Sequence, residues 1–429
     1  MKRTLPLPLL LLLFSFKAIC QPVGFFSFDS KTTFESNYPS SKNSIGINGD
    51  FLYGSNCITA NFANTYLTNQ YIDTTLKQNV SSRMSPNNYL GYDLDGGLSY
   101  THKLDTFLHI PVKSYYIAIK DRYHADANFP TDLFNLAFFG NEMYAGKTAD
   151  LSNLNANFLH YQQVQFGLIK EYPIYHGSYT VGVAISALKG QSSLNITTGS
   201  SSLYTQEAGE YLSLNAAMNM KQSDTTNSGY SAFNGWGLST DFFVSFHDSL
   251  SNFTVRLDVQ DLGFINWFGG IQNNIDTSFQ FSGLSVPNIL QPGDSLSTLS
   301  LDSNYKKAYN AHQVKKSYTT ILPALINLSL SCFLDPDKKI PLETGVNFRF
   351  SSNYTPYIYA GVSKFFNKTT IAGATLSFGG YRKFGLGINF GKDFGKGLIL
   401  MIRTDNAEAA VLPNSALGET LLFGFKKAF

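Results

Sequence analysis

The chain has 429 residues, a formal net charge of +2 and only 14% charged side chains. This balance excludes nucleic-acid-binding proteins, which need clustered basic residues, and we expect no nucleic-acid partner. Three cysteines are too few for the disulfide framework of an exported protein. Aromatic residues make up 15% of the chain, with 36 Phe and 25 Tyr. A membrane barrel can place such rings on its outer face and at its interfaces.

The amino terminus has the organisation of an export signal. Residues 1–20 combine a basic start, an apolar run over residues 9–14 and a short exit that ends at Cys20. The apolar run is too short to span a bilayer, which needs about 20 residues. We therefore predict Sec-dependent export, cleavage of the signal peptide near Cys20, and one mature domain of residues 21–429.

A lipoprotein is the alternative reading of the same segment, with Cys20 as the lipidated residue. Lipoprotein signals usually place a small residue directly before that cysteine, whereas Ile19 stands there. The cleaved signal peptide is the preferred interpretation, and lipidation stays open.

Strict alternation of apolar with small or polar residues dominates the chain. In residues 384–391 the apolar side chains are Phe384, Leu386, Ile388 and Phe390, and every second residue between them is Gly or Asn. Such a strand has one face for hydrocarbon and one for a wet or crowded interior. Repeated behind an export signal, it predicts an all-β protein, a transmembrane antiparallel β-barrel in the outer membrane with lipid around it.

The alternating stretches give about 14 to 18 strands, with about 16 as the best single value because such barrels usually have an even number. The stronger candidates are residues 45–54, 57–66, 92–100, 115–122, 163–168, 179–188, 211–220, 238–247, 254–260, 322–332, 344–350, 357–366, 371–378, 384–391, 398–403 and 420–429. The weaker candidates are residues 192–204 and 277–281.

Three longer connectors interrupt this pattern. Residues 73–84 and 130–139 have helical character, and residues 283–317 are rich in Ser, Asp, Asn and Lys. Barrels of this kind carry long loops outside and short turns on the periplasmic side. We assign the three connectors to the outer face or the lumen, as short helical loop or plug segments.

A soluble β-sandwich would also alternate, but the carboxy terminus favours the barrel. Leu421, Phe423, Phe425 and Phe429 share one face of the last strand. This ending resembles the signal read by the outer-membrane barrel-assembly machinery, which is therefore an expected partner. Lys427 interrupts the apolar face, although a lysine near the interface can extend its ammonium group to water.

Catalytic, metal and cofactor motifs are not convincing. The seven histidines are scattered without the paired helical spacing of a zinc site, and we interpret them as loop or rim residues. Gly385, Gly387 and Gly391 lie within a strand and not before a helix, so they do not indicate a nucleotide site. Ser363 lacks the second glycine of a nucleophile elbow. An outer-membrane lipase built around His247 is a distant alternative, and we expect no enzyme and no cofactor.

Charged residues recur on the strand faces opposite the apolar ones. A charge facing lipid at mid-depth would cost roughly 2–4 kcal/mol, and the phase of these strands avoids that cost. We therefore predict a lumen lined by Asp93, Asp95, Lys120, Arg122, Asp241, Arg256, Asp258, Glu343, Arg349 and Arg403. Both signs are present, so a salt-bridged lumen without a transported ion and a polar conduit tuned by these residues stay open.

One stretch carries a family resemblance. The run Asp261-Leu262-Gly263-Phe264-Ile265-Asn266-Trp267 resembles the signature of a Bacteroidota outer-membrane barrel family catalogued as a domain of unknown function. Weaker matching pieces are Asp132-Leu133-Phe134 with Gly140-Asn141, Gly283 after Phe279 and Phe281, Phe378-Gly379-Gly380-Tyr381, and Thr404-Asp405-Asn406. The chain departs at Asn37-Tyr38-Pro39, which only loosely resembles the Asn-Pro-Ala opening common in such barrels.

The resemblance implies an outer-membrane barrel and carries no established activity. Its distant neighbours are fatty-acid-transporter-like barrels and barrels of the type IX secretion and gliding machinery, which supply hypotheses only. The first hypothesis is a channel or transporter for small or hydrophobic solutes, with the apolar residues 133–139 along a ligand path. The alternative is a non-catalytic structural or adaptor barrel of the secretion or gliding machinery, whose loops, residues 283–317 especially, bind partner proteins.

Overall fold

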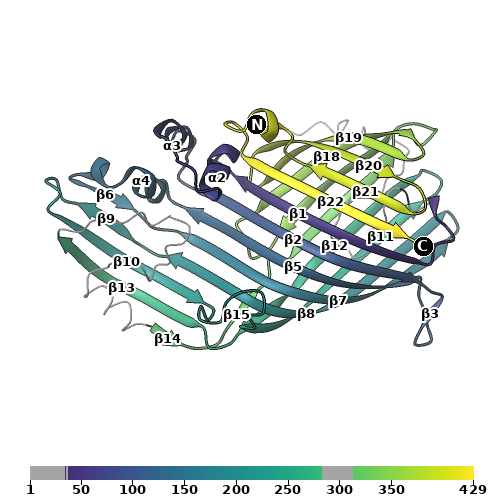
Figure 1. Ribbon diagram of the computed structural model, residues 1–429, viewed down its shortest axis with the longest axis horizontal. Coiled ribbons are helices and arrows are strands. Elements are labelled where there is room, and N and C mark those ends of the chain that lie inside the picture. The colour runs from purple at the N-terminus through teal and green to yellow at the C-terminus, as the bar shows by residue number, and fades with distance from the viewer. Residues whose placement is uncertain (1–33, 35–36, 283–312) are drawn as a thin grey trace, which may run out of the picture.

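A closed antiparallel β-barrel with 14 positions in its wall forms the body of the protein (Figure 1). The computed structural model describes Phe34 and residues 37–282 and 313–429. The predicted signal peptide and most of the connector 283–317 lie outside the described residues. The barrel closes where the first strand pairs with the last, from Ser44 opposite Ala428 to Gly54 opposite Gly418.

Each strand of the wall pairs with the wall strand before it and the wall strand after it in the chain. In pairing order the wall consists of β1 (Asn43–Ser55), β2 (Asn88–Lys103), β5 (Ser114–Phe129), β7 (Asn155–Ile174), β8 (Gly177–Thr198), β11 (Gly235–Asp248), β12 (Phe253–Trp267), β15 (Tyr318–Ile321) with β16 (Leu325–Phe333), β17 (Pro341–Arg349), β18 (Thr355–Asn367), β19 (Thr370–Gly380), β20 (Phe384–Asp393), β21 (Leu398–Thr404) and β22 (Gly418–Ala428). β15 and β16 share one position beside β12 and are separated at Pro323, which has no N–H for the ladder.

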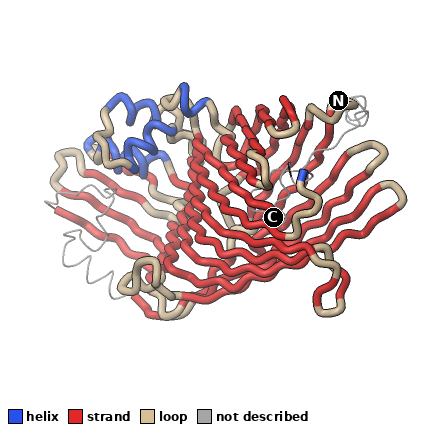
Figure 2. Tube along the Cα trace, turned by 45° about the vertical axis from the view of Figure 1, so that its right-hand side comes forward, coloured by secondary structure: helices blue, strands red, loops and turns tan. Residues whose placement is uncertain are grey.

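The two ends of the barrel differ in their connections. One end has short turns, including the hairpin of β3 (Thr106–Phe107) and β4 (Ile110–Pro111), and the backbones of Asn43 and Phe429 bond each other there. The other end carries the long loops and the helices, which gather at one side of the rim (Figure 2). These helices are α2 (Ala60–Leu67), α3 (Thr74–Ser81), α4 (Thr131–Phe139), the 3-10 turn η3 (Glu142–Tyr144) and α6 (Glu408–Val411).

Of the three described α-helices that precede β6, α3 and α4 were expected from the sequence and α2 was not. α3 and α4 fall within the connectors 73–84 and 130–139. Residues 57–66 were expected as a strand, and this prediction is wrong because they include most of α2. The Thr59 side chain accepts a hydrogen bond from the N–H of Phe62 and caps the helix. Phe62 then packs edge-on against Phe138 of α4, at 5.0 Å between ring centroids.

The sheet of the wall extends beyond the barrel at the long-loop end, and we call this extension the added sheet (Figure 1). β8 pairs with β11 up to Gly190, and its last residues then pair with β10 outside the barrel. The added strands are β6 (Lys147–Asp150), β9 (Ser202–Thr205), β10 (Tyr211–Gln222), β13 (Ile271–Ser282) and β14 (Gln313–Lys315). Of the 16 stronger candidates, residues 211–220 belong to these added strands and residues 57–66 mostly to α2, which leaves 14 positions in the wall. Alternation identifies a two-faced strand but not the sheet to which it belongs.

The outer face of the wall is apolar. On β20, Phe384, Leu386, Ile388 and Phe390 are all at least 39% exposed, while the inward Gly387 is buried. Among the described residues, no helix is long and apolar enough to cross a membrane. Large apolar side chains exposed on strand after strand exceed what a monomeric soluble protein tolerates. The barrel is therefore a transmembrane one.

Lys427 shows how the last strand accommodates its charge. Its ammonium group bonds the backbone oxygen of Lys396, in the short turn between β20 and β21. That turn is tight because Gly397 has a φ of 80° and a Cβ there would lie 2.1 Å from the oxygen of Ala428. The ammonium group thus reaches the short-turn rim and does not lie against hydrocarbon.

Candidate functional site

A polar network crosses the barrel interior, and it starts from the pairing of β2 with β5. Asp95 lies directly opposite Arg122, and Asp93 opposite His124. The guanidinium of Arg122 donates two hydrogen bonds to Asp95, at 3.1 Å to Oδ1 and 2.8 Å to Oδ2. Nδ1 of His124 lies 2.6 Å from Oδ1 of Asp93. Alternation along both strands turns these side chains inward together.

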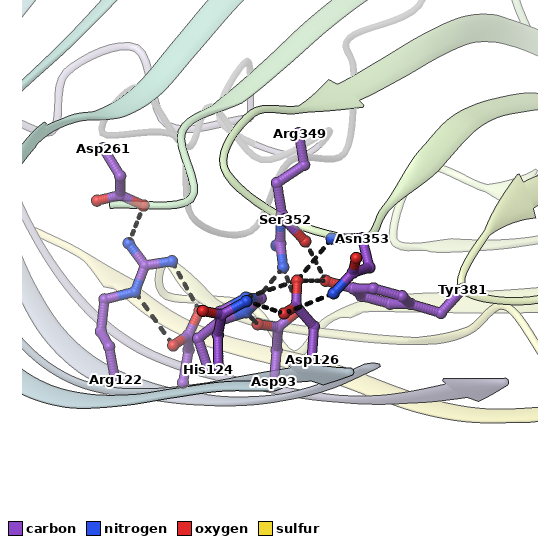
Figure 3. A network of polar contacts seen from close by, with 11 residues as sticks. Asp93, Arg122, His124, Asp126, Asp261, Arg349, Ser352, Asn353 and Tyr381 are labelled. Carbon is purple, nitrogen blue, oxygen red and sulfur yellow. Dashed lines mark hydrogen bonds and ion pairs between the residues drawn. The ribbon is translucent and has the colours of Figure 1, made fainter. Parts of the chain in front are cut away.

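Strands that are not neighbours in the wall complete the network (Figure 3). Arg349, the last residue of β17, donates from Nη1 to Asp93 Oδ2 at 2.7 Å. Arg122 also donates from Nη1 to Oδ2 of Asp261 on β12, at 2.5 Å. Since β2 does not pair with β17, nor β5 with β12, these contacts cross the interior.

Asp261 reaches the network through a β-bulge. The register between β11 and β12 shifts at this point, and Asp261 has a φ of 58°. Its N–H bonds the carboxylate of Asp241, and its own carboxylate bonds Arg122. The candidate strand over residues 254–260 ends directly before this residue, which opens the run that carries the family resemblance. The structure shows it as an inward anion in the middle of β12.

Loops at the long-loop end fold into the same space. The N–H of Asn353 donates to Asp126 Oδ2 at 2.7 Å, and the hydroxyl groups of Ser352 and Tyr381 lie 2.5 Å apart. Tyr381, in the turn after β19, is 2% exposed. A Cβ on Gly91 of β2 would lie 2.1 Å from its ring, so the wall accepts the ring because Gly91 has no side chain.

The predicted lumen residues fall into three groups. Asp93, Asp95, Arg122 and Arg349 belong to the central network. Near it, Lys120 is buried and opposed in charge by Asp241, which accepts a hydrogen bond from Gln165 at 2.6 Å.

The remaining predicted residues lie elsewhere in the wall, on β12, β17 and β21. Arg256 donates to Asp258 two residues later on β12, at 2.6 Å from Nη2 to Oδ1. Arg403 donates to Asp405 at 2.6 Å. Glu343 accepts a hydrogen bond from Tyr359 at 3.0 Å. Each charge thus has an identified polar partner, but the structure does not bring all of them into one cluster.

Sequence reasoning missed His124 and Asp126. The histidines were interpreted as loop or rim residues, whereas His124 is 5% exposed and lies between Asp93 and Asp126. The candidate strand stopped at Arg122, but β5 continues to Phe129. Extending the same period of two from Lys120 and Arg122 would have placed both residues on the inner face.

The space left within the network is small. A cavity of about 20 Å³ lies among Asp93, Arg122, His124, Asp261 and Arg349, which is room for one water molecule. Oδ1 of Asp261 and Nε2 of His124 have no hydrogen-bond partner among the described residues. Among the residues that the structure describes, no group of three or more His, Cys, Asp or Glu has the geometry of a metal site. Around this cavity the inward charges pack against one another.

An apolar cluster covers one side of the rim above this network. Phe62 of α2, Val80 of α3 and Phe134 of α4 pack with Phe129 at the end of β5. Cys57 belongs to the same cluster, and burial raises the pKa of its thiol to about 11. The three helices therefore form an apolar structure beside the mouth of the barrel.

Solved structures with a similar arrangement are distant outer-membrane barrels. The toluene transporter TodX of P. putida is 8% identical, with 92% of this chain and 91% of that chain covered and a TM-score of 0.40. The toluene transporter TbuX of Ralstonia pickettii is 7% identical, with coverages of 91% and 90% and a TM-score of 0.32. The translocator domain of the autotransporter NalP from Neisseria meningitidis is 6% identical, with coverages of 92% and 92% and a TM-score of 0.34. Likenesses this distant carry no argument about what this chain does.

A comparison with curated proteins finds no match. A family model, in contrast, matches residues 37–402, which include the predicted signature at Asp261–Trp267. The Bacteroidota origin expected from that signature stays a prediction. The match spans most of the chain, which therefore belongs to the family of unknown function DUF5723.

Proposed function

We propose that the protein is an outer-membrane channel for small or hydrophobic solutes, and that the structure describes its closed state. The observation that carries the proposal is that several of the groups that fill the interior come from connecting segments and not from wall strands. Tyr381 and Arg382 come from a turn, and Ser352 and Asn353 from a loop. A plug made of connecting segments can move without breaking the hydrogen bonds of the wall.

Two of the wall residues that lie directly against this plug are glycines. Gly91 faces the ring of Tyr381, and Gly418 faces the side chain of Arg382, 3.0 Å from where a Cβ would be. Withdrawal of the turn between β19 and β20 would therefore leave a passage bordered by backbone. The apolar cluster of α2, α3 and α4 at the rim supports entry of hydrophobic solutes from that side.

Planar-bilayer recordings test the channel. We expect rare openings for the wild-type protein and frequent, larger ones for Tyr381→Ala, because the substitution removes a ring from the plug and leaves the wall intact. Tyr175→Ala is the matched control, since Tyr175 is 93% exposed in a short turn at the other end. Silent membranes with correctly folded Tyr381→Ala protein would contradict the proposal.

A structural or adaptor barrel of the secretion or gliding machinery is the second candidate function. The added sheet of β6, β9, β10, β13 and β14 favours it, because this sheet stands outside the wall and offers a surface to partner proteins. A stable complex recovered from membranes, together with no solute flux in either tyrosine variant, would favour the adaptor over the channel.

A further inference from the structure

One row of residues on the outer wall breaks its apolar pattern. The row follows direct backbone pairing across six strands, from β8 to β22. It consists of Lys189, Gln162, Asp121, Gly96, Gly49 and Phe423. Its first three members are polar, its next two are glycine and its last is aromatic.

The polar end of the row holds an unbalanced positive charge. Nζ of Lys189 donates to Oε1 of Gln162 at 3.1 Å and to the backbone oxygen of Tyr230 at 3.2 Å. Both acceptors are neutral. Within residues 37–282 and 313–429, no carboxylate lies within ion-pair distance of this ammonium group.

A hydrogen-bonding pair lies beside this charge. Nε2 of His160 is 3.0 Å from Oδ1 of Asp121, and the ring of Tyr123 stacks on the imidazole at 3.6 Å between centroids. All three side chains belong to the outer face of β5 or β7. Polar side chains at lipid-facing positions are costly, so their concentration here calls for a polar occupant.

The glycine part of the row forms the floor of a groove of about 1070 Å³. A Cβ on Gly96 would have no atom within 4 Å, which means that the floor is open to the outside. Leu98 and Ile119 form apolar walls, and Tyr230 and Phe233 of the loop before β11 overhang the polar end.

The groove is polar at one end and apolar along the rest, as is a lipid with a head group and an acyl chain. Lys189 lies opposite Trp236, an exposed tryptophan at the start of β11 of the kind that marks a membrane interface. From Lys189 to Phe423 the row covers five strand spacings of about 4.8 Å, or about 24 Å. It leads from the long-loop rim to the middle of β22, so a head group at the rim would place an acyl chain over Gly96, as far as the Phe423 ring that covers Gly49.

We propose that this groove is a binding site for a phosphate-bearing membrane lipid. The phosphate pairs with the ammonium group of Lys189. Hydroxyl or ammonium donors of the head group bond the carboxylate of Asp121, and one acyl chain lies over Gly96 and ends against the ring of Phe423, which covers Gly49. The site is on the lipid side of the wall, so it does not depend on conduction through the barrel.

Tryptophan fluorescence provides a direct test, because the chain has only two tryptophans. Trp236 borders the polar end of the groove, whereas Trp267 is fully buried on the inner face. The full chain in neutral detergent micelles is titrated with phosphatidylethanolamine that carries dibrominated acyl chains. We expect saturable quenching of Trp236 at a low mole fraction of this lipid. Dibrominated diacylglycerol, which lacks the phosphate, should quench only in proportion to its mole fraction.

Two substitutions address the two halves of the site. Lys189→Gln removes the charge, and Gly96→Leu fills the groove where open space tolerates the side chain. We expect each to raise the half-quenching mole fraction about tenfold. For Lys189→Gln this is the loss of one charge-assisted contact of about 1.4 kcal/mol, and for Gly96→Leu it is the exclusion of the acyl chain by the leucine side chain. Lys364→Gln on β18 and Ala374→Leu on β19 are matched controls on the outer face and should leave the half-quenching mole fraction unchanged.

Three outcomes would overturn the proposal. They are equal quenching by the two brominated lipids, linear quenching in all variants, and loss of binding in Gly96→Leu with no effect of Lys189→Gln. Heat-modifiable migration on gels, which reports a folded barrel, must be equal for all four variants. If Gly96→Leu does not fold, Lys189→Gln and the diacylglycerol comparison still decide the matter.

Discussion

Arg349 and Asp93 are 256 positions apart in the chain, and their side chains meet at 2.7 Å across the barrel interior. Asp93 also contacts His124 through its other oxygen, so one carboxylate joins β2, β5 and the end of β17. The side chains of Asp93 and Arg349 are 9% and 13% exposed. This pair holds the loop that follows β17 inside the barrel.

Breaking this pair on one side is expected to destabilise the folded barrel. Asp93→Asn leaves a buried guanidinium without its carboxylate, which typically costs about 3–5 kcal/mol. The double variant Asp93→Asn with Arg349→Gln should lose less than the sum of the two single variants, because neither charge is then left alone. Urea unfolding of the reconstituted protein measures the three free energies. Asp337→Asn, which removes one side of an exposed pair with Lys339, should leave the midpoint unchanged.

Two glycines of β2 are expected to respond in opposite ways to the same substitution. Gly91→Ala places a methyl group 2.1 Å from the ring of Tyr381, so the ring must leave its position. Gly96→Ala meets open space on the outer face. We expect a loss of about 1–3 kcal/mol in the free energy of unfolding for Gly91→Ala, as for other overpacked sites, and almost none for Gly96→Ala. Adding Tyr381→Ala should restore part of the loss, and an unrestored loss would show that the ring is not the obstacle.

The amino-terminal segment is expected to be held at the short-turn end by Asp393. Tyr38 donates to its Oδ1 at 2.7 Å and Asn37 to its Oδ2 at 3.0 Å, while Phe34 is 1% exposed among Ile371 and Met401. Loss of both hydrogen bonds, each worth about 1 kcal/mol, should raise opening of the segment roughly tenfold or more.

Limited trypsin digestion at Lys42 measures that opening. The double variant Asn37→Ala with Tyr38→Phe should be cut faster than the wild type. Tyr175→Phe, in an exposed turn, should be cut at the wild-type rate. An unchanged rate in the double variant would mean that Asp393 does not hold the segment.

Much of the wall could be predicted because a membrane strand has two different environments. The phase of β2 is evident from Asp93 and Asp95, which flank the apolar Leu94, and the phase of β5 from Lys120, which follows the outward Ile117 and Ile119. Period and phase need only local sequence. They do not identify the partner of a side chain across the barrel, so the pairing of Arg349 with Asp93 could not be predicted from the sequence.

Three features of the structure differ from what alternation along the sequence predicts, and each difference has a physical reason. The alternation of residues 57–66 was overruled by a capped helix that packs on α4, a contact with a distant segment. Residues 211–220 alternate as wall strands do, yet β10 belongs to the added sheet. Asp261 turns inward through a bulge with positive φ, and a period of two breaks at such a residue.

The pH dependence of the loop between β5 and β7 is expected to reveal Tyr144. Burial, and then the hydrogen bond that its hydroxyl donates to Asp132 at 2.7 Å, raise the pKa of Tyr144 to about 12. The neutral phenol is therefore favoured in the folded state. Its stabilising contribution is complete below the ordinary tyrosine pKa of about 10 and disappears as the pH rises from about 10 to about 12.

Proteolysis of this loop as a function of pH tests the prediction. The wild-type loop should be cut progressively faster between pH 10 and 12, when Tyr144 begins to lose its proton. Tyr144→Phe lacks the hydroxyl, so its loop should be cut faster at neutral pH and show no additional rise in that window. Tyr175→Phe, in an exposed turn, should retain the wild-type profile. If wild type and Tyr144→Phe have the same profile, the hydrogen bond to Asp132 does not hold the loop.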